Sequence, residues 1–300
     1  MNTVNITECP LCGKAAFEKA VTCIDHYVTG ESFDICRCLH CGFLFTQNVP
    51  CESEMERYYN TPDYISHSDT HKGIVNRIYH RVRRWMLSKK AHLIERNSGL
   101  NHGILLDIGT GTGYFSGFMQ KRGWQVYATE KDSRARTFAE KQFEVHVDPP
   151  EMLDKYKQNS FDVITLWHVM EHLEKLNPTW DKLNFLLKER GILVIAVPNA
   201  NSFDANKYKE MWAAYDVPRH LWHFTPSTMQ QFGAAHGFIL AETYTMPFDV
   251  FYISILTEKY KRSRFPLLKG AINGTKGWLA TVARKEQSSS IIYVFRKKQS

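Results

Sequence analysis

The sequence predicts an α/β protein in which a parallel β-sheet is covered by helices on both faces, preceded by a small cysteine-rich module. After residue 101, strand-like and helix-like segments alternate, a pattern typical of parallel sheets covered on both sides. The first of these strands breaks into a glycine-rich turn. All seven cysteines fall within the first 51 residues. The beginning of the chain is therefore a module with its own chemistry.

Residues 1–51 are predicted to form a zinc ribbon. Cys9 and Cys12 form one CxxC pair, Cys38 and Cys41 form another, and a glycine follows each pair. Each pair can place two thiolates on one tetrahedral metal ion, so the four make a closed, structural zinc site. Two disulfides are the alternative, but the start of the sequence shows no export signal, which argues against an oxidising compartment. The other three cysteines are expected to be small buried hydrophobes: Cys23, Cys36 and Cys51.

Residues 52–100 are predicted to form a helical linker or lid. The segment 77–95 has apolar residues at helical spacing among basic ones and is expected to pack on the following domain. These apolar residues are Ile78, Val82, Trp85, Met86, Leu93 and Ile94. The tyrosine-rich stretch 58–66 before it is open to two interpretations, a lid over a bound ligand or core packing.

Residues 101–300 are predicted to form one domain with seven strands. The expected strands are 104–107, 125–129, 144–147, 161–167, 192–197, 238–244 and 291–296. Between the last two lies an insertion at about 247–289, rich in aromatic residues and with two basic clusters. It is interpreted as a substrate cap, with a dimer interface as the alternative.

The glycine-rich turn after the first strand points to a nucleotide-like ligand. Gly109, Gly111 and Gly113 alternate along it, so the backbone can bend sharply and a ligand can approach closely. The spacing departs from the dinucleotide pattern G-x-G-x-x-G. Asp107, just before the turn, would repel a pyrophosphate but suits the ammonium and sulfonium of S-adenosylmethionine. The next strand ends in Glu130, which could accept both ribose hydroxyls.

With these residues in this order, segment 101–300 resembles the class I S-adenosylmethionine-dependent methyltransferases. The resemblance implies a Rossmann-like sheet of seven strands, the last inserted antiparallel. It also implies a cofactor site made by Asp107, Gly109, Gly111, Gly113 and Glu130. Trp167, which ends the fourth expected strand, is a candidate aromatic wall of that site. A ribbon followed by such a domain is similar to a group of bacterial methyltransferases that modify small metabolites or nucleotide-linked sugars.

Histidines and a glutamate follow the fourth and fifth expected strands, where ligands bind in open α/β sheets. If a helix begins here, His168, Glu171 and His172 lie at i, i+3 and i+4 and share one face. Together with His220 their spacing resembles that of small-RNA 2′-O-methyltransferases, which hold a divalent ion. His168 stands where that family has glutamate, so zinc, iron or manganese would fit better than magnesium.

The same glutamate–histidine pair also resembles small-molecule O-methyltransferases in which it need not bind a metal. In that case His220 is the preferred general base, and Arg219 beside it could bind an acidic group of the substrate. A second divalent ion is therefore left open.

The expected activity is methylation, most simply O-methylation, of a small hydroxylated or sugar-like acceptor. The alternatives are an RNA methyltransferase whose ribbon grips nucleic acid, favoured by a net charge of +7, and a non-catalytic cofactor-binding scaffold. No N-P-P-Y tetrad of RNA-modifying enzymes follows the fourth strand, so nucleic acid is not an expected partner. A cytoplasmic location is expected, because no signal sequence and no apolar run of about 18 residues is present.

Overall fold

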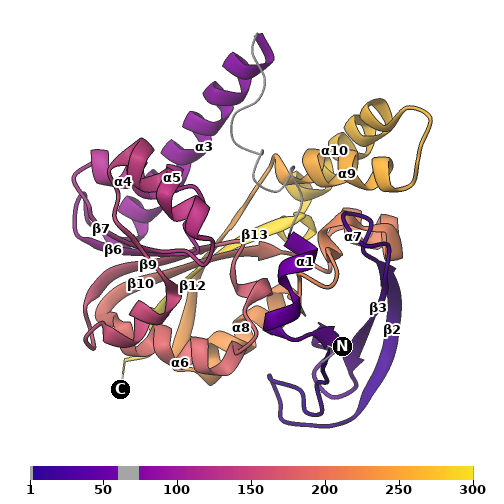
Figure 1. The fold of residues 1–300 in the computed structure, drawn as a ribbon, viewed down its shortest axis with the longest axis horizontal. Helices are drawn as coiled ribbons and strands as arrows, with labels where there is room; N and C mark the ends of the chain where they lie inside the picture. The colour runs from indigo at the N-terminus through magenta and orange to yellow at the C-terminus, as the bar shows by residue number, and fades with distance from the viewer. Residues whose placement is uncertain (1–2, 60–73, 300) are drawn as a thin grey trace. The chain divides into compact units, whose positions relative to one another are not determined.

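A computed structural model describes residues 3–59 and 74–299 (Figure 1). Its contacts divide the chain into two units. The first unit comprises Met1–Asn60, His168–Trp180 and Ala196–Tyr293, and the second comprises Thr61–Trp167, Asp181–Ile195 and Val294–Ser300. Most of the lid expected at 58–66 lies outside the described residues.

The first unit contains a four-stranded sheet that includes most of the cysteine-rich module. Its strand order is β11-β4-β3-β2. The strands are β2 (Phe17–Ile24), β3 (Ser32–Cys38), β4 (Leu44–Thr46) and β11 (Trp222–His223). A separate two-stranded sheet pairs β1 (Thr3–Val4) with β5 (Val49–Pro50) in antiparallel orientation. The cysteine-rich module thus shares its sheet with a strand from residues 222–223.

Antiparallel pairing fixes the register of this four-stranded sheet. Phe45 of β4 lies opposite Cys36 on one side and opposite Trp222 on the other. Alternate residues of β3, such as Phe33 and Ile35, are buried, as expected for a strand with one face on a core. This register brings the residues just before β11 next to the cysteine-rich module.

The first unit also contains helices and short 3-10 turns. The α-helices are α1 (Glu56–Tyr59), α7 (Phe203–Tyr208), α8 (Pro226–Ala235), α9 (Asp249–Tyr260) and α10 (Pro266–Ala283). The 3-10 turns are η1 (Glu52–Glu54), η3 (Met170–His172), η4 (Lys209–Met211), η5 (Ala213–Tyr215) and η6 (Lys285–Gln287). The insertion predicted at 247–289 is mainly the helical pair α9 and α10 (Figure 1).

A seven-stranded sheet has the order β12-β13-β10-β9-β6-β7-β8, which confirms the predicted α/β fold. Its strands are β6 (Ile104–Ile108), β7 (Gln125–Thr129), β8 (Val147–Asp148), β9 (Phe161–Trp167), β10 (Leu187–Pro198), β12 (Phe238–Thr245) and β13 (Ser290–Lys297). Six of the seven expected strands are present, and the last in sequence is inserted between β10 and β12. The strand expected at 144–147 overlaps β8 only at Val147, because α5 reaches Phe143 and Glu144 has a left-handed φ of 58°. The pairs β6–β7, β6–β9 and β7–β8 are parallel.

The helices that accompany the parallel strands are α3 (Ile74–Ser98), α4 (Tyr114–Lys121), α5 (Ser133–Phe143), η2 (Pro150–Lys155) and α6 (Leu176–Leu186). The helix expected at 77–95 is therefore present as α3. Its predicted apolar face is only partly correct, because Val82 and Trp85 are exposed while Ala91 and Ile94 are buried. Among the residues of α3 whose burial the structure describes, the fully buried ones lie in its second half. Among the described residues, none of the helices is both long and apolar enough to span a membrane.

Candidate functional site

The glycine-rich turn joins β6 to α4 in a conformation that requires glycine. Gly109, Gly111 and Gly113 have φ angles of 67°, 57° and 77°, in the left-handed region. A Cβ on Gly113 would lie 2.5 Å from the Cβ of Ala139 in α5. The N–H groups of Gly109 and Thr110 donate to the carbonyl oxygen of Thr129 at the end of β7. The turn is thus fixed against the neighbouring strand.

Glu130 lies at this turn, as predicted from its place after β7. Its Oε2 accepts a hydrogen bond of 2.8 Å from the N–H of Gly111, and its Oε1 accepts one of 3.0 Å from the N–H of Asp132. A carboxylate has about four lone-pair sites, so two remain for ligand hydroxyls. This arrangement is suited to a ribose.

Asp107 lies beneath the turn and is fully buried. Its Oδ1 accepts a 2.7 Å hydrogen bond from the Thr165 hydroxyl, and its Oδ2 accepts a 2.8 Å bond from the Ser116 hydroxyl. Burial raises the pKa of Asp107, although these hydroxyl bonds oppose the rise. The carboxylate therefore holds β6, β9 and α4 in register under the turn. Sequence reasoning missed Thr165 and Ser116, because their contribution depends on strand register.

Trp167 ends β9 and presents its ring to neighbours within the second unit. The Lys90 ammonium lies 3.9 Å from the ring centroid, and the Phe115 ring meets it edge-on with centroids 5.3 Å apart. Its buried indole N–H has no hydrogen-bond partner among the described residues. A buried donor without a partner is rare in proteins and often marks a ligand or water position.

The four cysteines of the predicted zinc site are brought together and are not oxidised to disulfides. The Sγ atoms of Cys9 and Cys41 are 3.5 Å apart, as are those of Cys12 and Cys38. A tetrahedron with Zn–S bonds of about 2.3 Å has sulfur–sulfur edges of about 3.8 Å, so the four sulfurs fit one zinc ion. Burial is the largest influence on the Cys38 thiol, yet backbone N–H groups that face the sulfur outweigh it and lower its pKa to about 7. The cluster could hold a metal.

The segment after β9 is not the start of an α-helix, which corrects the expectation for His168, Glu171 and His172. His168 has a φ of 57°, and only a short 3-10 turn, η3, follows. Glu171 is nevertheless brought beside His220, because the N–H of Leu221 donates to the Glu171 carbonyl oxygen at 2.8 Å. This backbone contact brings the loop that carries His220 to Glu171, as expected for the segment after the fifth predicted strand.

Glu171, His172 and His220 form one cluster, in which one possible ligand atom from each lies within 4.8 Å of the others. Glu171 is buried, and neither of its carboxylate oxygens has a hydrogen-bond partner among the described residues. His172 Nδ1 donates to the Arg219 carbonyl oxygen at 3.0 Å, and His220 Nδ1 donates to that of Ala214 at 2.9 Å. These bonds leave the Nε2 atom of each ring to accept a proton or bind a metal.

His168 stands apart from this three-residue cluster. Its Nδ1 lies 3.4 Å from Glu171 Oε1, an ion-pair distance without hydrogen-bond geometry, and its Nε2 lies 3.5 Å from Asp249 Oδ2. Burial alone would lower its pKa, but the two carboxylates outweigh burial and raise the pKa to about 9. The same pairing lowers the pKa of Glu171 despite its burial. His168 is thus a cation that balances the Glu171 charge.

Arg219 does not face a substrate, which overturns the expectation that it could bind an acidic group. Its guanidinium is 2% exposed. It donates to Asp25 at 2.9 Å, to Asp216 at 2.7 and 3.0 Å, and to the carbonyl oxygen of Tyr58 at 2.9 Å. Two carboxylates and a carbonyl thus occupy it. Arg219 ties the loop that carries His220 to the cysteine-rich module.

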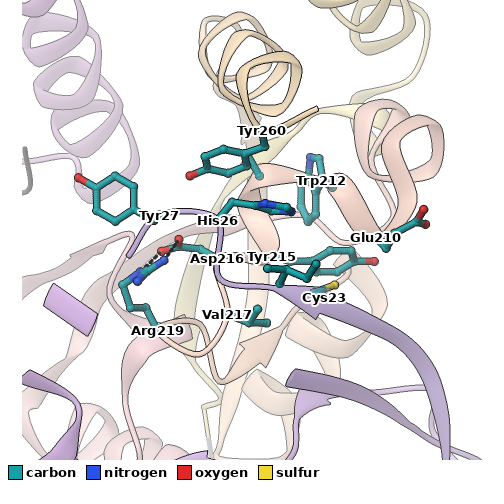
Figure 2. A pocket seen from close by; sticks show the side chains of 12 residues that line it. Cys23, His26, Tyr27, Glu210, Trp212, Tyr215, Asp216, Val217, Arg219 and Tyr260 are labelled. Atoms are coloured by element: carbon teal, nitrogen blue, oxygen red, sulfur yellow. Dashed lines mark hydrogen bonds and ion pairs between the residues drawn. The ribbon is translucent and has the colours of Figure 1, made fainter. Parts of the chain in front are cut away.

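A small pocket with an accessible volume of about 10 Å³ lies in the first unit next to this ion pair (Figure 2). His26 stacks on Tyr260 at one wall, with ring centroids 5.0 Å apart. Asp216 lines the pocket, and its Oδ2 lies 3.9 Å from His220 Nε2. The other labelled residues in Figure 2 are Cys23, Tyr27, Glu210, Trp212, Tyr215, Val217 and Arg219. A space of this size has room for about one water molecule.

Comparison with known proteins supplies the family. Residues 81–243, more than half of the chain, match the family described as methyltransferase domain. Among solved structures, phosphoethanolamine N-methyltransferase 2 of Haemonchus contortus, in complex with phosphomonomethylethanolamine and S-adenosylhomocysteine, superposes with a TM-score of 0.51 at 15% identity. The match covers 87% of this chain and 65% of that one.

A candidate sarcosine dimethylglycine methyltransferase from Galdieria sulphuraria gives a TM-score of 0.50 at 16% identity, covering 73% of this chain and 86% of that one. At these identities the two structures show the shared fold. No curated protein sequence matches the chain.

Proposed function

Because the chain belongs to the methyltransferase domain family, and is thus an S-adenosylmethionine-dependent enzyme, we propose that it methylates a hydroxyl oxygen of a small, sugar-like acceptor. S-adenosylmethionine would bind at the turn of Gly109, Gly111 and Gly113. Glu130 would accept its ribose hydroxyls, and Trp167 would line its site. Asp107 would act from below, by holding the turn in place.

The observation that carries the proposal for the acceptor is the buried Glu171 carboxylate, which has no hydrogen-bond partner among the described residues and faces two imidazoles. The His168 cation, 3.4 Å from Oε1, balances the charge of this carboxylate, but both oxygens lack a hydrogen bond, which a bound ion or ligand would replace. His172 and His220 each donate Nδ1–H to a backbone carbonyl, the arrangement that orients metal-bound histidines. We therefore assign these three residues to a divalent ion.

Two imidazoles and one carboxylate suit zinc, iron or manganese and leave coordination positions open for a substrate. An ion bound there would lower the pKa of an acceptor hydroxyl. The hydroxyl proton is lost to solvent, the oxygen attacks the methyl carbon, and the carbon–sulfur bond breaks to release S-adenosylhomocysteine. Glu171 and His172 come four and five residues after the end of β9, and ligands of open α/β sheets bind beyond the carboxyl ends of strands.

The four-cysteine cluster would hold a structural zinc ion, because four protein ligands leave no position open for a substrate. Thiolates of this kind fit the reducing cytoplasm, where we place the protein. RNA is not the proposed acceptor, and RNA binding is expected to stay at a non-specific, salt-sensitive level.

The experiment is a transfer assay with methyl-labelled S-adenosylmethionine, offered to a panel of hydroxylated metabolites and nucleotide sugars, with the labelled atom located by NMR. Glu171→Gln and His220→Asn should abolish turnover while leaving the affinity for S-adenosylmethionine unchanged. His146→Asn, at an exposed histidine, is the matched control and should stay active.

A chelator should stop the reaction, and an added divalent ion should restore it. If a chelator has no effect while His220→Asn loses about 10²–10⁴ in rate, His220 is a general base and the ion assignment is wrong. Label recovered on nitrogen or carbon would contradict O-methylation.

A further inference from the structure

Helix α10 (Pro266–Ala283) turns its large apolar side chains outward. Six of them are 41–68% exposed and make up what we name the α10 apolar face: Leu267, Leu268, Ile272, Trp278, Leu279 and Val282. At about 100° per residue these positions fall within an arc of about 140°, so they form one continuous stripe. Helices of globular proteins normally turn such a stripe toward the core.

The opposite side of α10 explains this inversion, because it is made of small residues packed on α9. A Cβ on Gly270 would lie 2.6 Å from the Cα of Ile255, and one on Gly274 would lie 2.5 Å from Phe251. Gly277 and Thr281 are also buried on this side. Close backbone packing leaves no room for larger side chains toward α9, which lies beside α10 in Figure 1. The contact with α9 is thus complete without the α10 apolar face.

Exposed cations surround this face. Between residues 259 and 285 there are eight basic residues and no acidic one. They are Lys259, Lys261, Arg262, Arg264, Lys269, Lys276, Arg284 and Lys285. All eight are exposed, and none makes an ion pair within the part of the chain that the structure describes. The charge is therefore available to an external partner.

We propose that the α10 apolar face docks onto the surface of a membrane that contains anionic lipids. A helix with leucines and a tryptophan on one side and lysines and arginines at its flanks lies in the headgroup region, its apolar face in the acyl boundary. Each cation near an anionic surface adds attraction. A second copy of the chain fits less well, because a two-fold contact through this face would bring two sets of eight unpaired cations together.

The test is flotation of the full-length protein with phosphatidylcholine vesicles, with and without phosphatidylglycerol. The protein should float with the anionic vesicles only, and raising the salt concentration should weaken binding. Leu268→Ser/Leu279→Ser should lower the bound fraction about tenfold or more, since two exposed leucines lose their burial in lipid. Lys269→Glu/Lys276→Glu should also weaken binding to the anionic vesicles, because it replaces two cations with anions.

Ile239→Ser is the matched control, because Ile239 is 53% exposed on β12, outside α10, and its loss should leave binding unchanged. Unaltered affinity for S-adenosylmethionine establishes that each variant is folded. Equal flotation with neutral and anionic vesicles, no flotation at all, or full binding by Leu268→Ser/Leu279→Ser overturns the proposal. Sedimentation analysis covers the alternative: a dimer that this double variant dissociates, without vesicle binding, would assign the face to a second copy.

Discussion

Replacing His223 with Gln should reduce the loss of stability on the acid side of neutrality. His223 lies in β11, is 4% exposed, and its Nε2 is 2.9 Å from the Thr46 hydroxyl oxygen. That hydroxyl donates its own proton to the His220 carbonyl oxygen at 2.7 Å, so His223 Nε2 must carry a proton and donate. The neutral ring can donate in this way as its Nε2–H tautomer. Burial, and secondarily the charge of His220, lowers its pKa to about 3.

The size of the effect follows from proton linkage. The pKa of histidine in the unfolded chain is about 6.5. Below this pH the unfolded state therefore binds a proton at His223 that the folded state does not bind. Stability is therefore lost as pH falls from about 6.5 toward the folded pKa. At about pH 5 the loss from this one residue is about 2 kcal/mol.

The assay is urea unfolding of the wild type and of His223→Gln at about pH 7.5 and about pH 5. Glutamine keeps an N–H donor for Thr46, and every other titrating group is common to both proteins. The wild type should lose about 2 kcal/mol more than the variant between these two pH values. An equal loss in both proteins would show that His223 is not held neutral, and the reasoning from its burial would fail.

Three further outcomes are expected. Cys38→Ser should lose the zinc ion and lower the unfolding temperature, with metal content measured by elemental analysis; retention of one zinc per chain would contradict the ligand assignment. Arg219→Met should cost about 3–5 kcal/mol in urea unfolding, because it leaves the buried Asp25 and Asp216 carboxylates without their cation, and a cost below about 1 kcal/mol would argue against the network. Glu130→Gln should weaken S-adenosylmethionine binding about tenfold to a hundredfold by calorimetry, through lost charge-assisted hydrogen bonds, and an unchanged affinity would exclude Glu130 from the site.

The seven-stranded fold could be predicted because each strand is marked locally, by an apolar run that ends in a turn. The glycine turn could also be predicted from nearby residues, because three alternating glycines followed by Glu130 are compatible with few other structures. The four cysteines are paired in sequence and likewise meet as expected. These features share one property: their signal lies within a few residues of the feature itself.

What the sequence could not provide depends on contacts between distant segments. Arg219 looked free to bind a substrate, because nothing in the sequence links it to Asp25, 194 positions earlier. His168 was expected on a shared helix face, yet its left-handed φ breaks the helix and Asp249 binds its other nitrogen. The exposure of the α10 apolar face was also not predicted, because an amphipathic sequence does not show which side of a helix faces the protein.

The assignment of a divalent ion to Glu171, His172 and His220 is tested most directly by calorimetric titration of Mn²⁺ into the zinc-loaded protein. The predicted result is one Mn²⁺ site per chain in the wild type, lost in Glu171→Gln and retained in Glu174→Gln, which changes an exposed neighbour. S-adenosylmethionine binding should be the same in all three proteins. Mn²⁺ binding that is absent from the wild type, or unchanged in Glu171→Gln, would contradict the assignment.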